Sequence, residues 1–200
     1  MNTLIHKITL PIVCLWLTAC GGGIPGISEP KADVSLPATY SKKGLEFQYP
    51  GNWTPGEEMD MIGVMQAGAE SSGSAIVLVH KFPGEVADDI STYAKDFSES
   101  MKENVPVGNI GSVNHSPVTK QGDYETITMN FSISLLGETV PHECTIYRKQ
   151  TGRNVLFIIA QAATEDLGNA RPGFDLVRQT LKYEPPDLGR AIPLAVLSRA

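Results

Sequence analysis

Cysteine and positive charge are both scarce in this sequence. It has three cysteines among 200 residues, too few for the disulfide-dense scaffold of small secreted domains. Sixteen Lys and Arg residues stand against twenty-two Asp and Glu residues, so the formal net charge is -6 at pH 7. Because nucleic-acid binding needs a basic surface that neutralises phosphates, we expect no nucleic-acid partner.

Catalytic signatures are also missing. The chain contains no Walker loop, no GxSxG elbow and no HExxH sequence, and its GxGxxG match at residues 21–26 follows no predicted strand, so it does not indicate a phosphate-binding turn. We therefore predict that the protein is not an enzyme and needs no cofactor. An enzyme is the third-ranked hypothesis, and it would require clustered polar groups with perturbed pKa values in a cleft.

A long hydrophobic run is absent as well, but a short one lies near the start. Residues 8–17 are mostly apolar and follow the basic Lys7. Ten helical residues at about 1.5 Å each cannot cross a hydrocarbon core of roughly 30 Å. A basic start, an apolar stretch and small residues after it are typical of a secretory signal peptide, which we predict over residues 1–19.

The residues around the predicted cleavage site carry a second signal. Leu17, Thr18, Ala19 and Cys20 resemble the lipobox of bacterial lipoproteins, in which an aliphatic and two small residues precede an obligatory cysteine. The resemblance implies cleavage between Ala19 and Cys20 and lipidation of Cys20 with acyl chains such as palmitate. Two or more acyl chains anchor a protein stably to a membrane. The alternative is an ordinary signal peptide in which the cysteine occurs by chance.

The residue after Cys20 bears on location. Proteobacterial lipoproteins held at the inner membrane commonly have Asp there, whereas this chain has Gly21. The resemblance therefore implies a lipid anchor in the outer membrane, facing the periplasm. After Cys20 we predict a flexible tether over residues 20–38, a single domain over residues 39–185 and a C-terminal tail over residues 186–200.

Hydrophobic periodicity predicts an α+β fold. Seven segments have strand-like patterns, and two segments have the stripe of an amphipathic helix. Asp88 and Asp89 stand where the first helix begins and are expected to cap it. We predict an antiparallel sheet of about six to seven strands with helices packed on it. The strands are expected at 45–49, 61–67, 75–82, 110–118, 124–136, 139–150 and 154–162, and the helices at 88–104 and 172–183.

The segment from Gly44 to Trp53, with the sequence GLEFQYPGNW, resembles the opening of PsbP-like domains. In that family a short strand runs into a Pro and a Trp, here Pro50 and Trp53. The order of elements is also similar to that of DcrB-like bacterial envelope lipoproteins. The resemblance spans about residues 40–184 and implies a PsbP-like α/β/α sandwich. It further implies a non-catalytic accessory or chaperone-like role, with no catalytic motif and no single ligand.

One pair of residues has the chemistry of a metal site. His142 and Cys144 are two residues apart on a predicted strand, so they share a face, and imidazole and thiolate suit zinc or copper(I). A third ligand would have to come from His80 or His115 on other strands. The alternative is that Cys144 behaves as a small buried hydrophobic residue, and we predict no metal.

Two binding roles follow from these patterns. The leading hypothesis is a lipid-anchored cell-envelope protein that binds another envelope component without catalysis. The alternative is a carrier of a small ligand, lipid or metal, on the periplasmic side. Met59, Met61 and Met65 could line a groove for such a ligand, because methionine adapts to irregular apolar partners, or could belong to a strand core.

Overall fold

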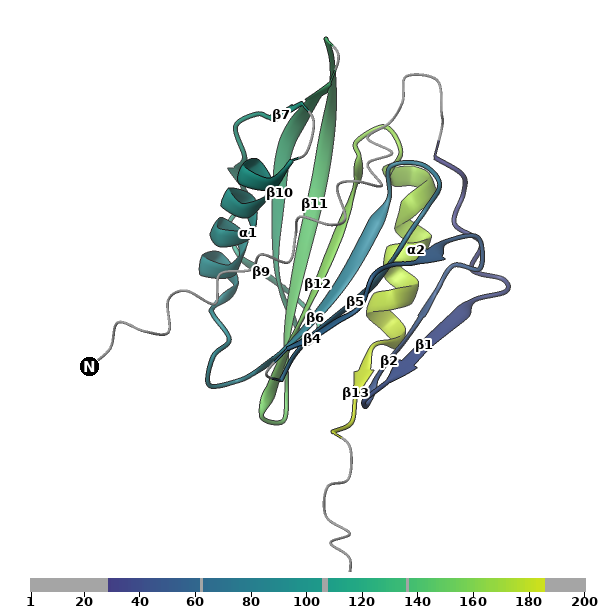
Figure 1. Cartoon of the computed structure of the whole chain (residues 1–200), viewed down its shortest axis with the longest axis vertical. Coiled ribbons are helices and arrows are strands. Elements are labelled where there is room, and N and C mark those ends of the chain that lie inside the picture. The colour runs from purple at the N-terminus through teal and green to yellow at the C-terminus, as the bar shows by residue number, and fades with distance from the viewer. Residues whose placement is uncertain (1–28, 62, 106–107, 136, 186–200) are drawn as a thin grey trace, which may run out of the picture.

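Figure 1 shows the computed structural model of the chain, which describes residues 29–61, 63–105, 108–135 and 137–185. Within these residues thirteen strands form two sheets, accompanied by two helices. The small sheet places β2 (Leu45–Tyr49) between β1 (Ala38–Lys42) and β13 (Lys182–Tyr183).

The large sheet is antiparallel and has ten strands in the described residues. Its main path runs β3-β5-β6-β12-β11-β10-β7, with β4 beside β5 and with β8 and β9 beside β10. The bounds are β3 Thr54–Pro55, β4 Met59–Met61, β5 Val64–Glu70, β6 Ile76–Pro83, β7 Asn109–Ile110, β8 Asn114–His115, β9 Thr119–Gln121, β10 Tyr124–Leu135, β11 Glu138–Thr151 and β12 Asn154–Ala163.

The α+β class is confirmed, but the prediction of six to seven strands is wrong. Strands β3, β4, β7, β8 and β9 have only two or three residues each. An alternation of apolar and polar residues needs four or more positions to show, so such strands leave no pattern in a sequence. The strand expected over residues 110–118 is instead two short strands, β7 and β8, which pair with separate parts of β10.

Helix α1 (Ile90–Asn104) confirms the helix expected over residues 88–104. Asp89 is its N-cap, and Oδ1 accepts hydrogen bonds from the backbone N of Ser91 at 2.9 Å and of Thr92 at 3.1 Å. The carboxylate thereby satisfies two backbone donors that have no partner inside the helix. The apolar stripe of α1 lies against β7, β10 and β11.

Helix α2 (Leu167–Thr180) begins five residues before the helix expected over residues 172–183. The prediction placed Pro172 in the first turn, but Pro172 lies inside the helix, and Leu181 is extended and leads into β13. Gly173 allows α2 to pack closely, since a Cβ there would lie 2.7 Å from Pro50 Cγ and 2.8 Å from the Trp53 ring. Among the described residues, no helix is long and apolar enough to cross a membrane.

Two hydrophobic cores lie on opposite faces of the large sheet. Helix α2 and the small sheet cover one face, and α1 lies on the other, as Figure 1 shows. Strand β6 contributes to both, because Val77 and Val79 face α2 whereas Leu78 and Phe82 face α1. Trp53 is buried and packs edge-on against Phe174 in the core on the α2 face.

The tether expected over residues 20–38 is wrong for its second half. Residues 29–38 lie against the domain, with Glu29 only 1% exposed and Ala32 4% exposed. The backbone N of Ala32 donates to Asn169 O at 3.0 Å, and the side chain of Asn169 donates to Glu29 O at 2.8 Å. These residues do not form a flexible tether, because backbone groups and one buried carboxylate bind them to the domain. Residues 20–28 and 186–200 lie outside the described residues.

Candidate functional site

Polar and aromatic residues form a row across the α1 face of the large sheet. Consecutive pairs are in register: Gln66 with His80 on β5 and β6, and His80 with Phe157 on β12. The row continues from Phe157 to Arg148 on β11 and from Arg148 to Glu125 on β10. Residues directly opposite in an antiparallel pair point to the same face. We call these five residues the cross-sheet row.

His80 forms the centre of the row and is held by α1. Its Nδ1 lies 2.6 Å from the hydroxyl of Tyr93, and the Tyr93 ring stacks on Phe157 with centroids 3.9 Å apart. Burial lowers the pKa of His80 to about 3, and burial raises the pKa of Tyr93. Both groups are therefore neutral at pH 7. We assign the shared proton to the Tyr93 hydroxyl, so that Nδ1 accepts it and Nε2 carries a proton.

Two polar atoms of the row are buried and have no hydrogen-bond partner, Nε2 of His80 and Oε1 of Gln66. The two residues are only 2% and 4% exposed. One atom is a donor and the other an acceptor, and their residues are direct neighbours across β5 and β6. A buried polar group without a partner costs about 1–3 kcal/mol. A donor and an acceptor without partners therefore belong to neighbouring residues in this part of the row.

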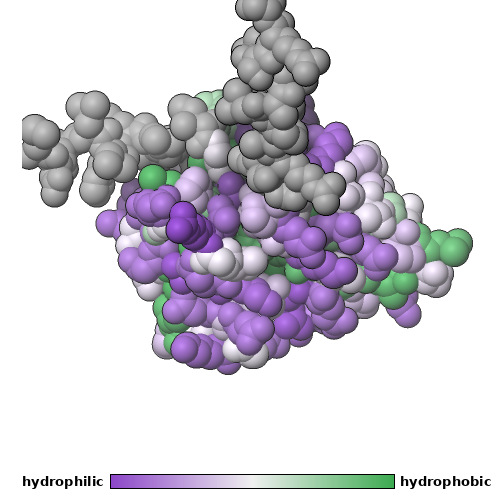
Figure 2. All heavy atoms as spheres, turned by 90° about the horizontal axis from the view of Figure 1, so that it is seen from below, coloured by the Kyte–Doolittle hydropathy of each residue, from purple (hydrophilic) through white to green (hydrophobic). Residues whose placement is uncertain are grey.

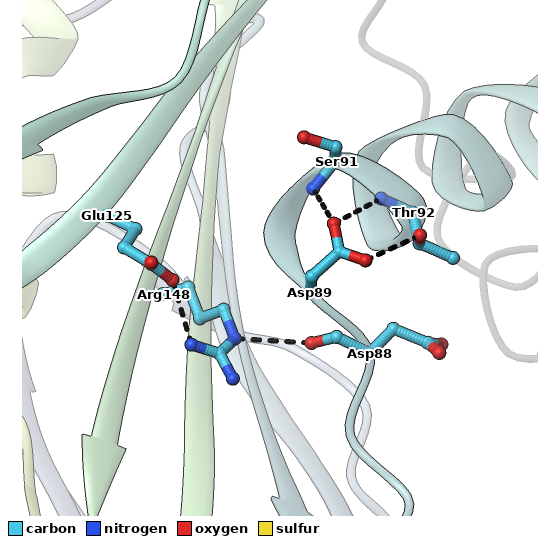
Figure 3. A network of polar contacts seen from close by, with 6 residues as sticks. All are labelled: Asp88, Asp89, Ser91, Thr92, Glu125 and Arg148. Atoms are coloured by element: carbon cyan, nitrogen blue, oxygen red, sulfur yellow. Dashed lines mark hydrogen bonds and ion pairs between the residues drawn. The ribbon is translucent and has the colours of Figure 1, made fainter.

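The other end of the row is charged and joins the sheet to α1 (Figure 3). Arg148 donates from Nη1 to Glu125 Oε2 at 2.8 Å and from Nε to the backbone O of Asp88 at 3.2 Å. Its guanidinium also lies 6.0 Å from the centre of the Phe157 ring. Since Asp88 precedes the capping Asp89, Arg148 fixes the start of α1 over the row.

A second buried polar cluster holds the N-terminal segment. Oε2 of Glu29 accepts hydrogen bonds from the backbone N of Ser74 at 2.7 Å and of Ala75 at 3.1 Å, and from the hydroxyl of Ser71 at 2.7 Å. Asp166 extends the cluster, because its Oδ2 accepts from Ser74 Oγ at 2.6 Å. We call Glu29 and these four partners the Glu29 clamp. It joins the segment after residue 28 to the β5–β6 turn and the start of α2.

Close packing reinforces the clamp. A Cβ on Gly73 would lie 2.3 Å from Glu29 Oε2 and 2.9 Å from Glu29 Cα, so only glycine leaves room for the buried glutamate. Because carboxylates bind backbone N–H groups strongly, the clamp is a specific attachment of residue 29 to this end of the sheet.

His142 and Cys144 share the α1 face of β11, as the spacing predicted. Burial raises the pKa of Cys144 and lowers that of His142, whose Nδ1 lies 3.1 Å from Val140 O. His115 on β8 is exposed and is separated from Cys144 by a whole strand, because both pair with Met129. His80 belongs to the cross-sheet row. In the described residues no group of three or more His, Cys, Asp or Glu side chains could hold a metal ion.

The other sequence-derived candidates have mixed outcomes. Cys20 and Ala19 lie outside the described residues, so lipidation and cleavage stay predictions. Met65 is part of the core on the α2 face, whereas Met61 is 52% exposed. Met59 pairs with Gln66 and so lies next to the cross-sheet row.

No protein-family model matches the chain, and no curated protein matches it. Several solved structures resemble it. The solution structure of the cyanobacterial PsbP (CyanoP) of Synechocystis sp. PCC 6803 is 12% identical with a TM-score of 0.47, covering 82% of this chain and 96% of that one. LpqN of Mycobacterium tuberculosis, described as involved in cell envelope biogenesis, is 11% identical with a TM-score of 0.41, covering 78% and 99%.

A third structure is the Ran-binding protein Mog1p of Saccharomyces cerevisiae, which is 7% identical with a TM-score of 0.43 and covers 75% of this chain and 96% of that one. Because these TM-scores are below 0.5, the likenesses leave the PsbP-like resemblance of the sequence a prediction. They also transfer no role to this chain.

Of the residues that form the two polar clusters, sequence reasoning named only His80, and it named that residue as a possible metal ligand. Glu29 stands in a proline-containing segment without periodicity, and Asp166 precedes a helix that was expected to begin later. Gln66 has no feature of its own that distinguishes it from a surface glutamine. The one available signal was the polar His80 within the apolar run of residues 76–82.

Proposed function

We propose that this protein is a lipid-anchored component of a bacterial cell envelope that binds another envelope component without catalysis. The observation that carries the proposal is the run Leu17-Thr18-Ala19-Cys20 after a short apolar segment. The sequence resemblance to PsbP-like and DcrB-like proteins agrees with an accessory role, and Gly21 favours the outer membrane.

The chemistry of the buried groups agrees with a binding role. His80 and Tyr93 are neutral and hydrogen-bond to each other, and the Cys144 thiol is held protonated by burial. The buried Glu29 carboxylate is engaged by backbone donors. These titratable groups act as structural elements, and their protonation states do not suit proton transfer or nucleophilic attack near pH 7.

The anchor is tested by expressing the full chain in a Gram-negative host and analysing its processed N-terminus by mass spectrometry. We expect an acylated Cys20 in the wild type, and a Cys20→Ser variant that stays unprocessed or becomes soluble. Cys14→Ser is the matched control, because that cysteine lies within the predicted signal peptide. A Cys20→Ser variant that is still processed and membrane-bound would refute the proposal.

The binding role is tested by crosslinking the acylated protein in cells, followed by mass spectrometry of the detergent extract. A stoichiometric envelope protein in the crosslinked species supports the accessory role. Absence of any protein partner, together with a co-purifying small molecule, contradicts it.

The second candidate function is that of a small-ligand carrier, and the unpartnered atoms of His80 and Gln66 favour it. A ligand there would accept a hydrogen bond from Nε2 of His80 and donate one to Oε1 of Gln66. Native mass spectrometry of purified wild type and Gln66→Leu tests this candidate. A bound small molecule lost in Gln66→Leu supports the carrier, and a wild type whose mass is that of the chain alone contradicts it.

A further inference from the structure

We propose that the end of the domain that carries the Glu29 clamp faces the lipid surface, at a distance limited by residues 21–28. This inference rests on the proposed lipid anchor at Cys20. It adds an orientation, because it states which end of the sheet lies near the membrane and which end faces away.

The position of the clamp carries the inference. Glu29 is 1% exposed and is bound by the β5–β6 turn, where its Oε2 accepts from the backbone N of Ser74 at 2.7 Å. Asp166, at the start of α2, accepts from the backbone N of Glu29 at 3.3 Å. The β5–β6 turn and the start of α2 therefore mark one pole of the molecule, the anchor pole.

The length of the linking chain follows from the clamp. Eight residues, 21–28, separate Cys20 from Glu29. Nine steps from residue 20 to residue 29 span at most about 30 Å even when fully extended. A tether running to residue 38, as the sequence suggested, would reach about 60 Å. The clamp thus halves the greatest distance between the anchor pole and the lipid.

The described chain ends at the opposite pole. Strand β6 runs from the anchor pole to Pro83, and Lys81 near its end lies 5.2 Å from the ring centre of Tyr183 in β13. Figure 1 shows β13 and the end of the described chain at the bottom, away from the start of α2. Figure 2 views this distal pole, and its surface outside the grey atoms is mostly hydrophilic, which suits an aqueous environment.

The orientation is tested with the acylated full chain in phospholipid vesicles that contain an acceptor-labelled lipid. One fluorophore is attached at Ser72→Cys on the anchor pole or at Arg153→Cys on the distal pole, both exposed positions. The buried Cys144 is protected from labelling in the folded protein. We expect several-fold stronger energy transfer from position 72 than from position 153. Equal or reversed transfer would overturn the orientation.

A linker insertion tests whether the short chain between Cys20 and Glu29 limits the distance from the anchor pole to the lipid. Twenty Gly and Ser residues inserted after Ser28 leave Glu29 in place and lengthen the path to the lipid. The difference in energy transfer between positions 72 and 153 should then become smaller, because a long flexible chain has a broad range of end-to-end distances. An unchanged difference in energy transfer would contradict the proposal that residues 21–28 limit the distance to the lipid. Mass spectrometry of the same samples reports acylation, so failure of the anchor is distinguished from failure of the orientation.

Discussion

The hydroxyl of Tyr93 and Nδ1 of His80 lie 2.6 Å apart, and both side chains are buried between α1 and the large sheet. The contact fixes α1 to the centre of the large sheet, and burial keeps His80 neutral. It has consequences for stability that can be measured.

The first prediction concerns acid. Burial lowers the pKa of His80 from 6.5 to about 3, so between these pH values the unfolded chain binds more protons than the folded one. The free energy of unfolding should therefore fall as the pH drops from 6.5 to 3, by up to about 1.4 kcal/mol per pH unit from this residue. Urea denaturation of wild type and His80→Gln across this window measures the slope.

His115→Gln is the control for this experiment, because His115 is exposed on β8. Hydrogen bonds from Thr92 and Ser91 lower the pKa of Asp89, so Asp89 also makes the free energy of unfolding fall as the pH drops, but at lower pH than His80. In the upper part of the range between pH 3 and 6.5, the free energy of unfolding should depend less steeply on pH in His80→Gln than in wild type. In His115→Gln this dependence should be unchanged. Identical slopes in wild type and His80→Gln would show that His80 is not buried neutral.

The second prediction isolates the Tyr93 hydroxyl. Tyr93→Phe keeps the ring stacked on Phe157 and leaves Nδ1 of His80 without its donor. We expect a loss of about 1–3 kcal/mol in the free energy of unfolding, since a buried acceptor loses its partner. Tyr147→Phe is the matched control, as its hydroxyl forms no hydrogen bond within the described residues. Equal losses in the two variants would argue against the contact.

The third prediction concerns the Glu29 clamp. Glu29→Ala removes three hydrogen bonds to one carboxylate oxygen and leaves the backbone N of Ser74 buried. We expect the free energy of unfolding to fall by roughly 2–3 kcal/mol. Lys31→Ala, two residues away and exposed, should change it little. Protease digestion should also cut near residue 29 faster in Glu29→Ala, and equal cutting rates would contradict the clamp.

The fourth prediction concerns Cys144. Its thiol is buried and burial raises its pKa, so it should not react with a thiol reagent in the folded protein near pH 8. Reaction should follow denaturation by urea and give one modification on a chain with acylated Cys20. Fast reaction without denaturant would show that β11 opens to solvent on its α1 face.

The fifth prediction concerns metals. Zinc or copper(I) should leave the melting temperature of the protein unchanged, because His142 and Cys144 lack a third ligand among the described residues. Metal that binds only the folded state would raise the melting temperature with concentration. A rise that disappears in His142→Ala would establish the site that we predict to be absent.

The parts of the fold that the sequence predicted are those with long, regular patterns. Ile90, Tyr93 and Phe97 repeat at helical spacing, and β10 alternates over twelve residues, so both elements could be expected. The start of α2 could not, because Pro172 resembles a first-turn proline.

The candidate site was less accessible to prediction for a topological reason. The cross-sheet row takes one residue from each of five strands, and only the register brings Gln66, His80 and Arg148 together. Turns and hydrophobic patterns set the register within the hairpins β5–β6, β10–β11 and β11–β12, but β6 and β12 are far apart in the sequence, so no turn sets their register. The clamp depends in the same way on the approach of Glu29 to Ser74, which are 45 residues apart.

The short strands of the large sheet have a consequence for contacts between copies of the protein. The outer edge of β10 carries three short strands, β7, β8 and β9, instead of one long neighbour, and the outer edge of β5 carries β3 and β4. A long open edge with regularly spaced N–H and C=O groups would invite another chain to add a strand and start aggregation. Here each edge is broken into pieces of two or three residues. Such edges give an incoming chain no continuous template, so copies at high local concentration can stay separate.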